Sequence, residues 1–127
     1  MHYVGKIDRE IYQSIVDGEI VSDDVIITDK QIQHIIDRRG KMFYEKYNED
    51  FSKIILNPDY VFKDDMKNTA LACKHYEDDG MSVNIVLRLI VKEENSSYKN
   101  SIITAIGESD KRFEQRLRNG NFIYKKP

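Results

Sequence analysis

The sequence predicts an α+β domain in which N-terminal helices pack on an antiparallel β-sheet. Apolar residues recur at helical spacing through the first half of the chain and alternate at strand spacing through much of the second half. Helices followed by consecutive strands are typical of α+β proteins. The length of 127 residues suits one domain spanning residues 1–127.

The N-terminal elements are short. Residues 4–7 form a predicted strand. Residues 8–16 form a predicted helix, because Ile11 and Ile15 lie four positions apart and so share a face. The apolar residues 25–27 then lead into the best-defined helix of the chain.

That helix covers residues 28–40 and carries both a start and a stop signal. Thr28 and Gln31 have the spacing of a capping box. Gly40 suits the position just past a helix end. A second helix is expected from after Gly40 to about Leu56, where Asn57-Pro58-Asp59 ends it because proline cannot continue a helix.

The helix over residues 28–40 has a polar side that bears on function. At about 100° per residue, Ile32, Ile35 and Ile36 share one face. His34 lies well away from that face, and Arg38 lies beside it. The two side chains therefore share the polar side of the helix.

The second half of the chain predicts strands and one further helix. The expected strands cover residues 60–62, 68–76, 82–92, 99–106 and 122–124, and the expected helix covers residues 109–117. A turn at residues 78–80 joins the second and third of these strands, and a loop at residues 93–97 joins the third and fourth. This order predicts an antiparallel meander.

Composition restricts the possible functions. The formal charge of −2 excludes a chain that is basic throughout, but residues 98–127 carry seven basic and three acidic residues, which permits a local surface for polyanions. No apolar stretch approaches membrane-span length and no signal-peptide pattern is present, so a cytoplasmic protein without membrane contact is expected. The single Cys73 stands in an apolar run and predicts a buried structural thiol. No metal or cofactor motif occurs.

Several polar residues stand where a pure scaffold would carry apolar ones. Arg88 interrupts an apolar strand, Asn68 and Thr69 open another, and Ser101 and Thr104 lie in a third. Each also has a structural interpretation: Arg88 is equally compatible with one half of a buried ion pair, and serine and threonine are tolerated in strands. His34 alone is more often a surface or satisfied core histidine than a catalyst.

Together these residues match the needs of RNA cleavage without a metal. That reaction requires a base for the 2′-hydroxyl, an acid for the leaving oxygen, and cations or donors around the phosphorane. Histidine titrates near neutral pH, and arginine binds phosphate with a planar fork. Ser101 and Thr104 are three positions apart and would point to opposite faces of a regular strand. Both reach one site only if a bulge intervenes or the strand ends between them.

Several short segments in a fixed order also carry a family resemblance. They are Val4-Gly5-Lys6-Ile7, Ile27-Thr28-Asp29-Lys30 with Gln33-His34-Ile35, Asn57-Pro58-Asp59-Tyr60, Asn68-Thr69-Ala70, Val86-Leu87-Arg88-Leu89, Tyr98-Lys99-Asn100-Ser101-Ile102-Ile103-Thr104-Ala105 and Arg118-Asn119-Gly120. In their order and spacing, over nearly the whole chain, they resemble the phage-associated branch of the barnase–EndoU–colicin–RelE nuclease superfamily.

The resemblance implies N-terminal helices on a four-stranded, or slightly larger, antiparallel sheet. It also implies a toxin-like RNase of bacterial prophages and mobile elements that needs no cofactor. His34 would be the active-site histidine, and the residues around it would be Arg38, Thr69, Arg88, Ser101 and Thr104. The expected substrate-binding residues are Arg39, Asn68, Lys99 and Asn100.

One departure from the family and two other interpretations remain open. Some relatives place a second histidine near Arg39, a role that His75 or a tyrosine would have to fill here. Without it, a non-catalytic module that binds RNA or protein through the same groove is the alternative. A third interpretation is a toxin held inactive by an antitoxin or immunity protein. RNA, including tRNA, is the expected partner, and catalysis requires His34, Arg38 and Arg88 to converge on one cleft with at least one hydroxyl.

Overall fold

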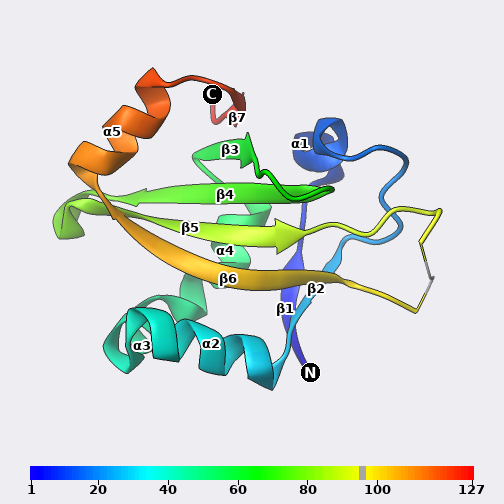
Figure 1. Ribbon diagram of the computed structural model, residues 1–127, viewed down its shortest axis with the longest axis horizontal. Coiled ribbons are helices and arrows are strands. Elements are labelled where there is room, and N and C mark those ends of the chain that lie inside the picture. Colours follow the sequence, from blue (N-terminus) through cyan, green and yellow to red (C-terminus); the bar gives the residue numbers. More distant parts are fainter. Residues whose placement is uncertain (95–96) are drawn as a thin grey trace.

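Seven strands form one mixed sheet at the centre of the molecule (Figure 1). The computed structural model describes residues 1–94 and 97–127. The strands are β1 (His2–Lys6), β2 (Asp24–Ile27), β3 (Tyr60–Lys63), β4 (Thr69–Tyr76), β5 (Met81–Arg88), β6 (Asn100–Ser109) and β7 (Phe122–Lys125). Their order across the sheet is β1-β2-β6-β5-β4-β3-β7. All neighbours pair antiparallel except β2 and β6, which are parallel.

Helices lie on both faces of this sheet. They are α1 (Arg9–Tyr12), α2 (Asp29–Arg39), α3 (Lys41–Tyr47), α4 (Phe51–Leu56) and α5 (Asp110–Arg118), with 3₁₀ turns η1 (Gln13–Ile15), η2 (Asn48–Asp50) and η3 (Glu77–Asp79). The larger core lies on the face covered by α4, where Ile54 and Ile55 meet Ile85 and Leu87 of β5. The second core is smaller and lies under α5 on the opposite face, where Phe113 is buried. Figure 1 shows α5 over one end of that face and leaves the other end uncovered.

The α+β class is confirmed, and the sheet is larger than the expected four-stranded antiparallel one. Strands β3, β4, β5 and β6 are consecutive antiparallel neighbours, as a meander requires. The antiparallel pair β1–β2, whose strands are separated in the chain by α1 and η1, extends the sheet through a parallel pairing of β2 with β6. On the other side of the sheet, β7 pairs with β3. These pairings join distant segments, so local sequence patterns do not report them.

The helix expected at residues 28–40 is confirmed with its capping box. The side chain of Thr28 accepts a hydrogen bond from Gln31 N, and the side chain of Gln31 accepts one from Thr28 N. Gly40 has a φ of 97°, which suits glycine at a helix end. The single helix expected as far as Leu56 is instead broken at Asn48, because its amide donates to the carbonyls of Tyr44 and Glu45 and competes with the helical ladder.

The strand expected at residues 82–92 ends earlier, at Arg88. Beyond that point the backbone amides leave the ladder: Leu89 N donates to the carbonyl of Asn68, and Ile90 N donates to the side chain of Asn100. The loop expected at residues 93–97 includes residues 95 and 96, which lie outside the described residues.

Candidate functional site

Three of the sequence-predicted residues lie side by side in one row across three strands. Thr69 of β4 pairs with Arg88 of β5, and Arg88 pairs with Ser101 of β6. Directly paired residues project from the same face of a sheet. Leu87, which precedes Arg88 on β5, belongs to the larger core. The row therefore faces the opposite side of the sheet, which α5 covers only at one end (Figure 1) and which is called the open face below.

A β-bulge brings Thr104 to the same face as Ser101. Leu87 pairs with Ile102, whereas the preceding Val86 pairs with Thr104, so Ile103 is the extra residue on β6. Without the extra residue, the side chains at positions 101 and 104 would face opposite sides of the sheet. The condition stated from the sequence, that a bulge must intervene for both hydroxyls to reach one site, is therefore met.

The two threonine hydroxyls differ in their bonding. The Thr69 side chain is fully buried, and its hydroxyl donates to the carbonyl of Lys67. The Thr104 hydroxyl is also buried but makes no hydrogen bond with any residue in the described part of the chain. A buried hydroxyl without a partner costs free energy, on the order of 1–3 kcal/mol. Thr104 therefore has an unused donor and acceptor on the side of the sheet that carries Ser101, beneath the molecular surface.

His34 and Arg38 lie on the exposed side of α2, which packs against β6. Ile32 lines a recess with Tyr44 and Phe51 on the helical side of the molecule. At about 100° per residue, His34 points in roughly the opposite direction to Ile32. It is therefore turned away from the helical layer, and its exposure excludes a core histidine. Within residues 1–94 and 97–127, no hydrogen bond or ion pair links His34 or Arg38 to the strand row.

Arg88 forms an ion pair. The sequence suggested such a pair but did not identify the acidic residue. Nη2 of Arg88 donates to Oε2 of Glu94 at 2.6 Å, and its Nη1 donates to the carbonyl of Leu89. Both side chains of the pair are about one-quarter exposed, at 28% for Arg88 and 25% for Glu94. They line a cleft with Asn68 and Asp17, and neither His34 nor Arg38 is part of its lining. The expected convergence of His34, Arg38 and Arg88 on one cleft is therefore not seen.

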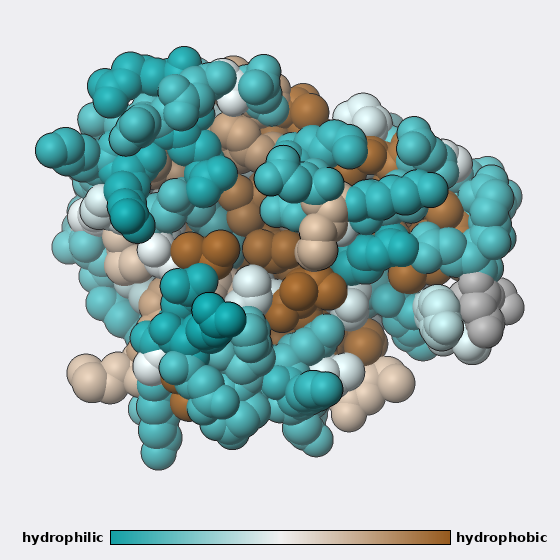
Figure 2. All heavy atoms as spheres, viewed as in Figure 1, coloured by the Kyte–Doolittle hydropathy of each residue, from teal (hydrophilic) through white to brown (hydrophobic). Residues whose placement is uncertain are grey.

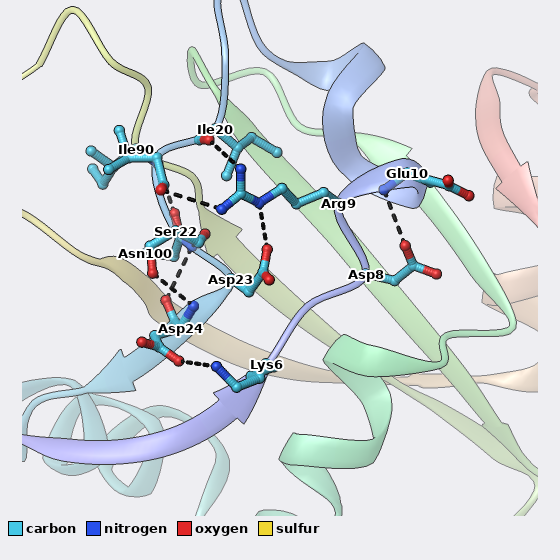
Figure 3. A network of polar contacts seen from close by, with 11 residues as sticks. Lys6, Asp8, Arg9, Glu10, Ile20, Ser22, Asp23, Asp24, Ile90 and Asn100 are labelled. Carbon is cyan, nitrogen blue, oxygen red and sulfur yellow. Dashed lines mark hydrogen bonds and ion pairs between the residues drawn. The ribbon is translucent and has the colours of Figure 1, made fainter.

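Two residues expected to bind substrate serve the backbone instead. The Asn100 side chain is fully buried, accepts from Ile90 N, and donates to the carbonyls of Ser22 and Asp24 (Figure 3). Asn68 is also buried, and its side chain accepts from Asp17 N. Both amides are committed to holding chain segments together, so neither is available to a substrate.

The other candidates lie at the surface. Arg39 and Lys99 are exposed, so a charged ligand can reach them. His75, considered as a replacement for the missing second histidine, is exposed, and its Nε2 lies 2.9 Å from Oδ1 of Asp110. Cys73 is buried as expected, and burial raises the pKa of its thiol.

Sequence reasoning missed a polar network on the same face, beneath α5. Arg116 donates from Nε and Nη2 to the two carboxylate oxygens of Glu108, each at 2.9 Å. Glu108 also accepts from Asn84, which in turn accepts from the hydroxyl of Ser82. Burial acts to raise the pKa of Glu108, but the hydrogen bonds and charge of Arg116, together with the hydrogen bond from Asn84 and the charge of Arg112, hold that pKa below its ordinary value. The available signal was the excess of basic residues between positions 98 and 127.

The open face has an apolar centre with polar borders. Figure 2 shows apolar side chains gathered in the middle of the face, with hydrophilic ones around them. Ile103 and Ile106 of β6 are partly exposed and pack against the smaller core on this face.

Comparisons with known proteins assign no relative. No family model, no curated protein and no solved structure matches the chain. Among residues 1–94 and 97–127, no helix has the length and apolar character needed to cross a bilayer. In the same residues, no three His, Cys, Asp or Glu side chains gather in a way that would hold a metal ion.

Proposed function

We propose that this protein is an endoribonuclease that cleaves RNA without a metal and leaves a 2′,3′-cyclic phosphate. The observation that carries the proposal is the bulge at Ile103, which gathers Ser101 and Thr104 on the face that also holds Arg88 and Thr69. A fold that needed only a stable sheet would bury apolar side chains here. Instead this face carries a partly exposed guanidinium and three hydroxyl groups, of which those of Thr69 and Thr104 are buried.

The chemistry assigns a role to each group. A base removes the proton of the 2′-hydroxyl, whose oxygen attacks the adjacent phosphorus; the bond from phosphorus to the 5′-oxygen breaks, and an acid protonates that oxygen. His34 is exposed and lies outside the cleft that Arg88 lines, and the family resemblance is what assigns it one of these two proton-transfer roles. Arg88 binds the phosphate oxygens, Arg38 supplies a second cation from α2, and the partly exposed Ser101 contributes a further hydrogen bond.

Glu94 is the candidate for the second proton-transfer role. Its carboxylate lies against Arg88 and takes part in the same cleft. A carboxylate held beside the phosphate-binding arginine is in position to accept the proton of the 2′-hydroxyl. Glu94 would then replace the second histidine that some members of the resembling nuclease family have near the position of Arg39.

The variant His34→Ala tests the proposal. Because His34 is exposed and makes no hydrogen bond within the described chain, its loss should leave the melting temperature unchanged. Cleavage should fall by about 10²- to 10⁴-fold, the usual contribution of one acid or base. Gln33→Ala, on the neighbouring exposed position of α2, is the control and should cleave as the wild type does. Equal cleavage by both variants would contradict a catalytic His34.

A non-catalytic RNA-binding module is the second candidate function. The observation that favours it is the engaged state of Arg88, whose fork is occupied by Glu94 and by a backbone carbonyl. In this interpretation the pair fixes the loop after β5, and RNA binds through the basic residues around the open face. Wild-type protein that binds RNA and leaves it intact would favour this function. Either function acts on cellular RNA and so belongs in the cytoplasm.

A further inference from the structure

A cleft of about 440 Å³ lies between α5 and β3, apart from the row of Thr69, Arg88 and Ser101. Three cationic side chains, one carboxylate, amides and one aromatic ring form its walls. These residues are Lys63, Arg112, Arg116, Glu108, Gln115, Asn119, Asn121 and Phe62, together with Gly120.

One cation of the cleft is fixed in place. Arg116 uses Nε and Nη2 to bind both oxygens of Glu108, and its guanidinium lies 5.7 Å from the centre of the Phe62 ring. The charge of Glu108 is thereby balanced, and the hydrogen bonds that Arg116 donates to Glu108 raise the pKa of Arg116. Nη1 of Arg116 makes no hydrogen bond with any residue that the structure describes, so it is available to a ligand.

The other two cations of the cleft are not held in ion pairs, although the charge of Arg112 acts on Glu108. Lys63 and Arg112 are exposed, and neither forms a hydrogen bond or ion pair within residues 1–94 and 97–127. Some exposed lysines outside the cleft do have acidic partners, as Lys46 has in Asp79. The cleft therefore presents two free positive charges beside a prepositioned guanidinium, an arrangement that attracts a chain of phosphates.

The amides of the cleft come from one face of α5 and the turn after it. Gln115 and Asn119 lie three and seven positions after Arg112, so they share its side of the helix. Gly120 and Asn121 both have positive φ, at 79° and 78°, which turns the chain back and places Asn121 in the cleft wall. These groups add neutral donors and acceptors beside the charges.

We propose that this cleft binds backbone phosphates of single-stranded RNA that extends across the open face. Phe62 at its floor belongs to the same cross-strand row as Leu71, Val86 and Thr104. Neighbouring strands are about 4.8 Å apart, so three inter-strand steps separate the cleft from Thr104. A short single strand spans that distance over the apolar centre of the face. The choice of RNA as the polyanion rests on the proposed function.

The test measures binding of a labelled 2′-O-methyl oligoribonucleotide by fluorescence anisotropy at several salt concentrations. This probe keeps the phosphates but has no free 2′-hydroxyl to react. Arg112→Gln should weaken binding and lower the slope of log affinity against log salt by about 0.7, the value for one lost phosphate contact with a single strand. Lys63→Gln should act in the same direction.

The matched control is Arg118→Gln, which removes the same charge from an exposed position of α5 outside the cleft wall. It should retain most of the affinity and the full salt slope. Equal losses in Arg112→Gln and Arg118→Gln would overturn the proposal, as would absence of binding by the wild type. If binding depends on Arg112 but natural RNA stays intact, the RNA-binding cleft is supported and only the proposed cleavage activity is contradicted.

Discussion

Asn100 lies in one of the segments that carry the family resemblance, yet its side chain stabilises the fold and does not face a substrate. Its amide bonds to the backbone of two other segments, before β2 and after β5. Asn100→Ala removes these bonds and leaves buried backbone groups unpaired, so we expect the free energy of unfolding to fall by about 3 kcal/mol. Urea denaturation measures this loss. A variant as stable as the wild type with weakened RNA binding would contradict the structural role.

Glu94 gives a second prediction at the scale of one residue. Glu94→Gln removes the charge that competes with phosphate for Arg88, so a 2′-O-methyl oligonucleotide should bind more tightly than to the wild type. The same change removes the proposed base, so cleavage of natural RNA should slow by about 10²-fold or more. Anisotropy and a gel assay measure the two effects. If affinity and cleavage both stay at wild-type values, Glu94 has only a structural role beside Arg88.

At the scale of elements, the network beneath α5 ties the helix to β5 and β6. The pKa of Glu108 lies below its ordinary value of 4.5, so its ion pair with Arg116 stabilises the fold above that pH. The stabilisation is lost as the pH falls through the lower pKa of the folded state. Glu108→Gln should therefore be less stable than the wild type at neutral pH, with a difference that shrinks in acid. Urea midpoints measured from neutral pH down to below pH 3 check this, and a constant difference would contradict it.

Elements governed by local chemistry were predictable from the sequence. The capping box at Thr28 and the glycine at position 40 define α2, because both signals act within a few residues. The break at Asn48 and the end of β5 at Arg88 were not predictable, because a side-chain amide and distant backbone groups decide them. The partner of Arg88 was missed for the same reason.

At the scale of the whole molecule, sheet register decides which residues can act together. Thr69, Arg88 and Ser101 are far apart in sequence and meet only through the pairing of β4, β5 and β6. The sequence could name these residues and state that Ser101 and Thr104 needed a bulge, but it could not show the bulge. It also could not show that the parallel pairing of β2 with β6 would extend the sheet. The position of the Arg116 network depends on how α5 folds back over the sheet, which no local pattern reports.

The proposed function requires the open face to cleave RNA with side chains alone. The most direct test incubates purified protein in EDTA with total RNA and with tRNA, beside His34→Ala, and determines the chemistry of the new ends. We expect cleavage by the wild type, products ending in 2′,3′-cyclic phosphate, and intact RNA with the variant. Intact RNA with both proteins, or equal cleavage by both, would contradict it.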